Sequence, residues 1–208
     1  MKELGRFAEE QGVPLTAEAM KKAEAYIELL KQYNAKTNLT AEKDEDALYL
    51  RHLADGFPSA AYLKKHLGAA PRVADLGSGG GFVGFGFKLA WPEAEVTLIE
   101  ALQRKYDFLN MAAARSGLKG LRVLKARAGQ DAVMGGYDAV VERALAPLDE
   151  AVALAVPLLK PGGLFVAYQS DEPDVKSVRA GARFVDMITY RLPREERSRR
   201  LAVFRREE

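Results

Sequence analysis

The pattern of apolar and polar positions changes in character near residue 67. Before that point apolar residues recur at the spacing of a helix face, and Thr16 stands where a helix N-cap is expected. A second helix is predicted from Asp44 to Pro58, because aspartate favours the N-cap and proline interrupts a helix. We therefore predict an N-terminal helical extension over residues 1–66.

Short apolar runs alternate with helical stretches over residues 67–208. Strands that alternate with helices form parallel sheets with helices on both faces. Helices are predicted up to Leu89, over Gln103–Ser116 and over Leu148–Leu159. Strands are predicted over Arg72–Leu76, Glu95–Glu100, Arg122–Lys125, Tyr137–Glu142 and Leu164–Gln169, and in the tail over Phe184–Leu192 and Leu201–Arg205. The fold class is therefore α/β, with a Rossmann-like, seven-stranded, mostly parallel sheet in one compact unit.

The composition excludes several classes of protein. The chain has no cysteine and only two histidines, so disulfide scaffolds, zinc fingers, iron–sulfur clusters and thiol nucleophiles are excluded, and we expect no metal site. No apolar run approaches the ~20 residues of a membrane span, and the first residues lack the apolar core of a signal peptide. We expect a cytoplasmic monomer without a membrane partner.

Charge is nearly balanced over the whole chain but uneven along it. The net charge is +2, whereas residues 183–206 carry eight arginines and three acids. This tail either faces phosphates or forms a solvated rim that keeps the protein soluble. The candidate phosphate contacts surround the turn before the last strand: Arg194, Arg197, Arg199 and Arg200.

Candidate chemistry begins with the glycine cluster after the first predicted strand. Gly79–Gly84 formally matches G-x-G-x-x-G, a pattern that lets a ligand approach the backbone and the next helix N-terminus. Asp75 precedes the cluster and Phe82 enters the turn, and this arrangement resembles the S-adenosylmethionine (SAM) loop of class I methyltransferases. The alternative is a glycine-rich turn that holds no ligand.

Glu100 ends the second predicted strand. A carboxylate at that place accepts hydrogen bonds from the ribose hydroxyls of an adenosine. Because SAM and NAD both carry this ribose, Glu100 does not separate the two cofactors, and it could also be a solvated acid. Lys160-Pro161-Gly162-Gly163, before the fifth strand, again resembles class I methyltransferases, although such helix stops are common.

Four further segments resemble one family together. With the glycine loop they are similar to the 16S ribosomal RNA guanine-N7 methyltransferases, the glucose-inhibited division protein B family, from about Tyr33 to Tyr168. The segments are Tyr33–Thr40, Arg51–Asp55, Arg127-Ala128 and Arg143–Leu148. The resemblance implies a class I methyltransferase fold, SAM as cofactor, and methylation of a guanine in 16S ribosomal RNA, either free or in the small-subunit particle.

The resemblance also assigns site residues. It implies that Gly77, Gly79 and Phe82 line the SAM site, and that Ala128 and Gly129 face the adenine. The sequence departs from the family's pattern in three places. Val83 replaces a proline, Gly129 replaces an acid and Gln169 replaces a lysine, so adenine recognition is left to backbone groups or to Asp131.

The implied chemistry needs few catalytic side chains. Guanine N7 carries a lone pair and no proton, so it attacks the methyl group without a general base, and the enzyme has only to align the reactants. Arg143, predicted at the carboxyl end of the fourth strand, is the candidate for both cofactor binding and catalysis, because arginine is a natural partner of the N7 and O6 acceptors. Its structural alternative is an ion pair that braces the loop.

Arg51 and His52 are candidate RNA contacts from the helical extension. A lone histidine on a helix is more often a packing residue, and Asn34 and Asn38 more often fasten the turn between helices. Three rival functions stay open: a SAM methyltransferase for another RNA or a small molecule, a non-catalytic SAM-binding module that docks on RNA, and a nicotinamide dehydrogenase. The last is the least supported, since Asp75 precedes the loop and no Tyr-x-x-x-Lys pair is present.

Overall fold

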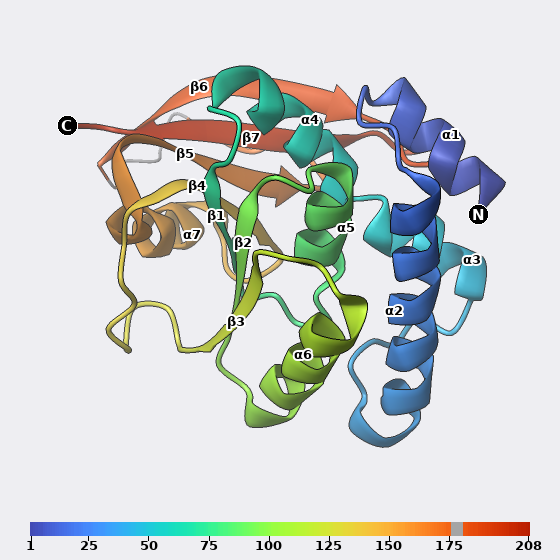
Figure 1. Ribbon diagram of the computed structural model, residues 1–208. Coiled ribbons are helices and arrows are strands. Elements are labelled where there is room, and N and C mark those ends of the chain that lie inside the picture. The colour runs from blue at the N-terminus through green and yellow to red at the C-terminus, as the bar shows by residue number, and fades with distance from the viewer. Residues whose placement is uncertain (176–180) are drawn as a thin grey trace.

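A seven-stranded sheet forms the centre of the computed structural model, which describes residues 1–175 and 181–208 (Figure 1). The strand order is β3-β2-β1-β4-β5-β7-β6. The first five strands in that order are parallel, whereas β7 pairs antiparallel with both β5 and β6. The strands are β1 (Arg72–Leu76), β2 (Glu95–Glu100), β3 (Leu121–Lys125), β4 (Tyr137–Arg143), β5 (Leu159–Gln169), β6 (Ala182–Tyr190) and β7 (Arg199–Arg206). The predicted sheet is thus confirmed.

Helices cover both faces of the sheet. The side with α5 and α6 is overlaid by α2 and α4, and α7 lies on the other side (Figure 1). The helices are α1 (Lys2–Glu10), α2 (Ala17–Thr37), α3 (Glu45–Ala47), a π-helical segment η1 (Leu48–Leu53), α4 (Gly56–His66), α5 (Phe82–Ala90), α6 (Gln103–Ser116), α7 (Leu148–Ala155) and a 3₁₀ turn η2 (Val156–Leu158). Because the helices cover the two faces of the sheet, the loops gather at the edge formed by the carboxyl ends of the parallel strands.

The N-terminal helices share an apolar core with the sheet. Thr16 caps α2 as predicted, since its hydroxyl accepts a hydrogen bond from the N–H of Ala19 at 3.1 Å. Side chains of α2 such as Ile27 and Leu30 are fully buried in the same cluster as Val73 of β1. The helical extension therefore forms one wall of the molecule that carries the sheet.

Several predicted boundaries differ from the structure by a few residues, and two of the differences have a clear physical reason. Pro58 does not end a helix but lies in the first turn of α4, where its missing N–H would have no intrahelical partner. The fifth strand begins at Leu159 rather than Leu164, and Lys160-Pro161-Gly162-Gly163 lies within it. The register of β4 and β5 shifts between Tyr137 and Ala139, so the irregular residues fit into the strand.

Candidate active site

The glycine loop joins β1 to α5 and has a backbone that only glycine adopts readily. Gly77, Gly79 and Gly81 have φ values of 71°, 59° and 88°. A Cβ on Gly77 would lie 2.7 Å from Leu145 Cδ1, and one on Gly81 would lie 2.6 Å from Leu109 Cδ2. The loop therefore brings its own backbone, and the first N–H groups of α5, to the carboxyl edge of the sheet.

Two buried carboxylates hold this loop. Glu100, at the end of β2, accepts hydrogen bonds from the N–H of Gly79 at 2.9 Å and of Leu102 at 2.8 Å. Asp75, at the end of β1, accepts one from the N–H of Gly84 at 3.0 Å, and burial raises the pKa of Asp75 to about 6. Glu100 thus lies at the loop, as its place in the sequence predicts, and each of its oxygens has capacity for a further donor.

Tyr26 of α2 supports the loop from behind. Its hydroxyl donates to the carbonyl oxygen of Gly80 at 2.6 Å, and its ring stacks on Phe85 with 4.2 Å between centroids. Phe82 is 5% exposed, with the rings of Tyr26 and His52 as neighbours. Nothing in the sequence indicated that the hydroxyl of Tyr26 holds the glycine loop.

Ala128 and Gly129 lie in the turn that follows β3. Gly129 has a φ of 76°, and a Cβ there would lie 2.7 Å from Leu154 Cδ2 of α7. The carboxylate of Asp131 accepts a hydrogen bond from the N–H of Arg127 at 2.6 Å. Asp131 thus helps to close this turn, together with the N–H groups of Gln130 and Asp131, which donate to the carbonyl oxygen of Arg127. The sequence places glycine where the left-handed backbone requires it.

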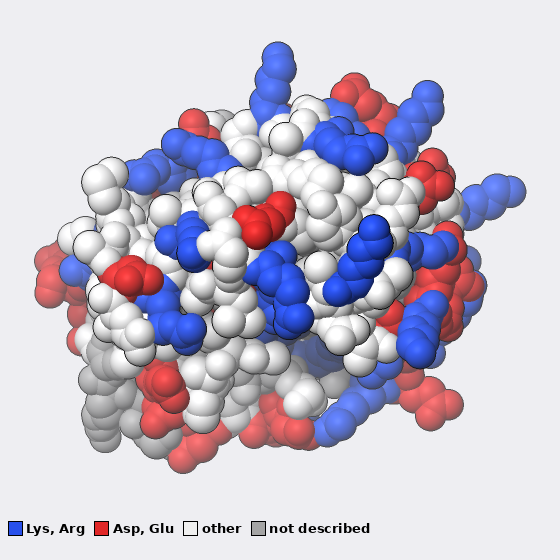
Figure 2. All heavy atoms as spheres, turned by 90° about the horizontal axis from the view of Figure 1, so that it is seen from below, with Lys and Arg blue, Asp and Glu red and all other residues white. Residues whose placement is uncertain are grey.

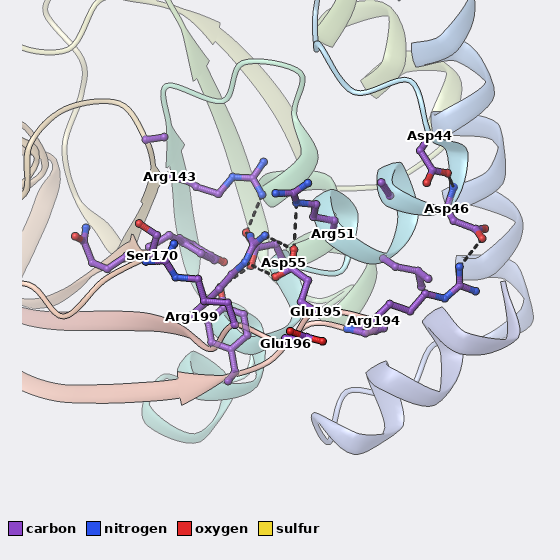
Figure 3. A pocket seen from close by; sticks show the side chains of 18 of the residues that line it. Asp44, Asp46, Arg51, Asp55, Arg143, Ser170, Arg194, Glu195, Glu196 and Arg199 are labelled. Atoms are coloured by element: carbon purple, nitrogen blue, oxygen red, sulfur yellow. Dashed lines mark hydrogen bonds and ion pairs between the residues drawn. The ribbon is translucent and has the colours of Figure 1, made fainter.

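A cavity of about 910 Å³ lies beside the glycine loop, at the carboxyl ends of β4 and β5 (Figure 3). The N-terminal helical segment and the β6–β7 turn form its other walls. Of the residues predicted to bind the cofactor or to act in catalysis, only Arg143 lines it, and four of the predicted RNA contacts line it as well: Arg51, Arg194, Arg197 and Arg199. The remaining predicted residues lie outside its wall: Gly77, Gly79, Phe82, Glu100, Ala128 and Gly129. Residues after β4 belong to both places, because Leu145 contacts the loop while Ala144 and Ala146 line the cavity.

Arg143 is ion-paired with a residue from the helical extension. Its Nη1 donates to Oδ2 of Asp55 at 2.7 Å, and Asp55 is fully buried (Figure 3). The same oxygen accepts a hydrogen bond from Nη1 of Arg199 at 2.9 Å. The ion pair that the sequence offered as the alternative for Arg143 therefore exists, and the arginine still faces the cavity with 24% of its side chain exposed.

The tail arginines are also largely paired with acids of the protein. Arg194 meets Glu3 and Asp46, each at 2.7 Å, and Arg197 pairs with Asp171. Arg199 holds Glu195 at 2.7 Å in addition to Asp55. Lys and Arg side chains are spread among acidic ones on the face in Figure 2, without forming a continuous basic band. Three of the four proposed phosphate contacts thus already neutralise internal charges.

Glu142 is a cavity residue that the sequence did not reveal. It is 1% exposed, accepts a hydrogen bond from the N–H of Leu145, and precedes Ala144, whose φ of 60° is unusual for a residue with a Cβ. Burial raises the pKa of Glu142 to about 7, and the charge of Asp75 acts in the same direction. A strand-end acid in an apolar run gives no sequence signal that distinguishes it from a solvated one.

His52 packs against the loop, as the structural alternative predicted. Its ring lies 4.8 Å from that of Phe82, and burial, together with the charge of Arg143, lowers the pKa of His52 to about 4. The ring is therefore neutral near pH 7. Asn34 fastens the turn after α2 through two 2.9 Å hydrogen bonds with the backbone of Thr40, whereas Asn38 ends the helix with a left-handed φ of 49°.

The described residues contain no group of three or more His, Cys, Asp or Glu side chains that could hold a metal ion. Across residues 1–175 and 181–208, no helix has the length and apolar character that a bilayer crossing requires.

Comparison with known proteins identifies the family. Residues 19–200 match the model of GidB, rRNA small subunit methyltransferase G. This chain belongs to the GidB family. A ribosomal RNA small subunit methyltransferase G of Bacillus cereus (strain AH187) is 31% identical over 94% of this chain and 85% of its own length. Its counterpart in Staphylococcus haemolyticus (strain JCSC1435) is 30% identical over 96% and 87%.

Solved structures agree on the architecture. A Burkholderia thailandensis 1,6-didemethyltoxoflavin-N1-methyltransferase with bound S-adenosylhomocysteine has a TM-score of 0.57, with 16% identity over 94% of this chain and 92% of that one. The N-methyltransferase NodS of Bradyrhizobium japonicum has a TM-score of 0.54, with 18% identity over 72% and 93%. The family assignment, the class I fold, SAM as cofactor and guanine-N7 methylation of small-subunit ribosomal RNA, all predicted from the motifs, are confirmed.

Proposed function

We propose that GidB-family chemistry takes place here between two adjoining parts of one sheet edge: SAM lies at the glycine loop, and the target guanine of small-subunit ribosomal RNA enters the cavity beside it. The observation that carries this proposal is the shared turn after β4. Leu145 of that turn contacts the loop at Gly77, and Ala144 and Ala146 line the cavity. Ligands of open α/β sheets bind at this edge.

The residues at the loop fit the cofactor. Gly77 and Gly79 expose a left-handed backbone without side chains, and the oxygens of Glu100 retain capacity for the ribose hydroxyls. We assign the methionine side of the site to Gly77, Gly79 and Phe82, and the adenine side to Ala128 and Gly129. When bound, SAM supplies an electrophilic methyl group on a sulfonium.

The cavity suits a base better than a phosphate. Five arginines and six acids line it, so the positive charges of the arginines are offset by neighbouring carboxylates. A guanine is uncharged and offers O6 and N7 as acceptors on one edge. We assign Arg143 to the guanine, with an N–H donated to O6, so that N7 keeps its lone pair for the methyl group. The chain then acts by orientation, and no side chain has to remove a proton.

Transfer of a labelled methyl group tests the proposal. The purified protein and tritiated SAM are incubated with small-subunit particles or with naked 16S ribosomal RNA, and mass mapping locates the modified base. We expect label at N7 of a single guanine, and a strong loss of transfer in Arg143→Ala with SAM affinity largely retained. SAM and RNA binding without transfer would instead identify a docking module, and transfer only to a small molecule would refute the RNA assignment.

The oligomeric state, the cellular compartment and the division of the chain are also part of the proposal. We propose a monomer in the cytoplasm, with residues 1–66 as a helical extension and 67–208 as the SAM-binding unit. Light scattering during gel filtration tests the oligomeric state. A stable dimer at working concentration would refute the monomer.

A further inference from the structure

Asp55 lies between η1 and α4, in the wall of the cavity, and none of its surface is exposed. An aspartate at a helix start usually accepts a hydrogen bond from the first turn. Asp55 makes no such bond to α4. Its carboxylate is instead committed to groups from distant strands, so the residue serves a tertiary contact rather than its own helix.

Three strands supply the partners of this carboxylate. Oδ2 accepts from Nη1 of Arg143, which ends β4, at 2.7 Å, and from Nη1 of Arg199, which begins β7, at 2.9 Å. Oδ1 accepts from the hydroxyl of Tyr190, which ends β6. One carboxylate from the helical extension thus ties together the ends of strands that border the cavity (Figure 3).

Arg143 and Arg199 differ in how many of their N–H donors remain free. Arg199 also grips Glu195 with two hydrogen bonds, of 2.9 and 2.7 Å. In the described part of the chain, Asp55 is the one acceptor that Arg143 meets. A guanidinium has five N–H donors, so most of those on Arg143 are available to the cavity that it lines.

We propose that Asp55 is a positioning residue for methyl transfer: it fixes the guanidinium of Arg143 so that its free N–H groups meet the target guanine. This inference rests on the proposed function of the cavity. Arginine has a long side chain with several rotatable bonds, and an unrestrained one would occupy the geometry needed for transfer only part of the time. Anchoring one nitrogen sets the direction of the others, and the gain appears in the rate of transfer rather than in cofactor binding.

Asp55→Asn tests the proposal because it keeps the size of the side chain and removes its charge. We expect kcat for transfer to RNA to fall at least about tenfold, with Kd for SAM within about twofold of the wild type. Asp55→Glu, which restores the charge one methylene further out, should recover part of the rate. Ser59→Ala is the matched control, since Ser59 is a buried polar residue of α4, the helix that follows Asp55. It accepts a hydrogen bond from the hydroxyl of Tyr168 and does not itself line the cavity.

A double-mutant cycle separates positioning from a structural role. If Asp55 acts through Arg143, then Asp55→Asn in an Arg143→Lys background should slow transfer little beyond Arg143→Lys alone. If the double variant instead lost the product of the two single-variant rate losses, the inference would be overturned. Equal falls in SAM affinity and kcat in Asp55→Asn would also overturn it. If Asp55→Asn does not fold, Asp55→Glu carries the same cycle. Failure of both variants to fold would make Asp55 a structural residue.

The two proposals fail differently. A wild-type protein that transfers no methyl group to ribosomal RNA refutes the proposed function. A wild-type protein that does so, beside a folded Asp55→Asn of equal kcat, refutes only the positioning role of Asp55.

Discussion

Replacing Glu100 by glutamine tests whether this carboxylate both shapes the glycine loop and serves the cofactor. The side chain is 6% exposed and accepts N–H groups from Gly79 at 2.9 Å and from Leu102 at 2.8 Å. A glutamine of the same shape has one oxygen, so it can accept at one position, while its NH₂ group confronts a backbone donor at the other.

The magnitude follows from these two bonds. A hydrogen bond to a charged group contributes about 1.5–3 kcal/mol, and a buried N–H left without an acceptor costs about 1–3 kcal/mol. The free energy of unfolding should therefore fall by about 1–3 kcal/mol in Glu100→Gln. Because the ribose loses a charged acceptor and the loop loses its anchor, Kd for SAM should rise about 10- to 100-fold, at 1.4 kcal/mol for each factor of ten.

Calorimetric titration with SAM and denaturant unfolding give the two quantities on the same samples. Glu95→Gln is the matched control, because Glu95 begins the same strand but is about half exposed and pairs only with Arg122 among the described residues. SAM affinity unchanged in a folded Glu100→Gln would refute the ribose assignment. A loss of affinity without any loss of stability would refute the anchoring role.

Three further predictions follow from the same geometry. Gly84→Ala should lower stability by about 1–3 kcal/mol, because its Cβ would lie 2.1 Å from Leu98 Cδ2; denaturant unfolding measures this against Gly68→Ala, where the space is open. The pKa of Glu142 is raised to about 7 by burial, so the folded state binds more protons than the unfolded state between about pH 4.5 and 7, and stability should fall with rising pH in that window, by on the order of 3 kcal/mol in total. Glu142→Gln should flatten that slope, and an equally steep slope in the variant would assign it to other groups. Arg197→Gln should reduce the salt dependence of single-stranded RNA binding by about 0.7 log units per log unit of salt, since its exposed pair with Asp171 yields readily to a phosphate; an unchanged slope would place the phosphate contacts elsewhere.

Local sequence patterns were enough to predict much of the fold. The alternation of short apolar runs with helical stretches predicted the five parallel strands, since a parallel sheet buries whole runs and requires a helix between them. Two further apolar runs in the tail predicted β6 and β7, which pair antiparallel. Thr16 and Gly117 marked the start of α2 and the end of α6, because capping depends on neighbouring residues. Pro58 misled because proline is tolerated in the first turn of a helix, and the sequence does not say which turn it occupies.

The candidate site likewise has features that local sequence determines and features that depend on the tertiary structure. The left-handed glycines and the strand-end Glu100 are local features, so the sequence by itself determined the place of the cofactor loop. Arg143, Arg194 and Arg199 each meet an acid from a segment far away in the chain, and only the tertiary structure decided that Asp55 meets two of these arginines. Charge along a sequence shows how many arginines lie close together, but not which acids fold against them. The number of arginines therefore suggested a phosphate-binding tail, whereas the fold used Arg194 and Arg199 to join this tail to the N-terminal helices beside the cavity.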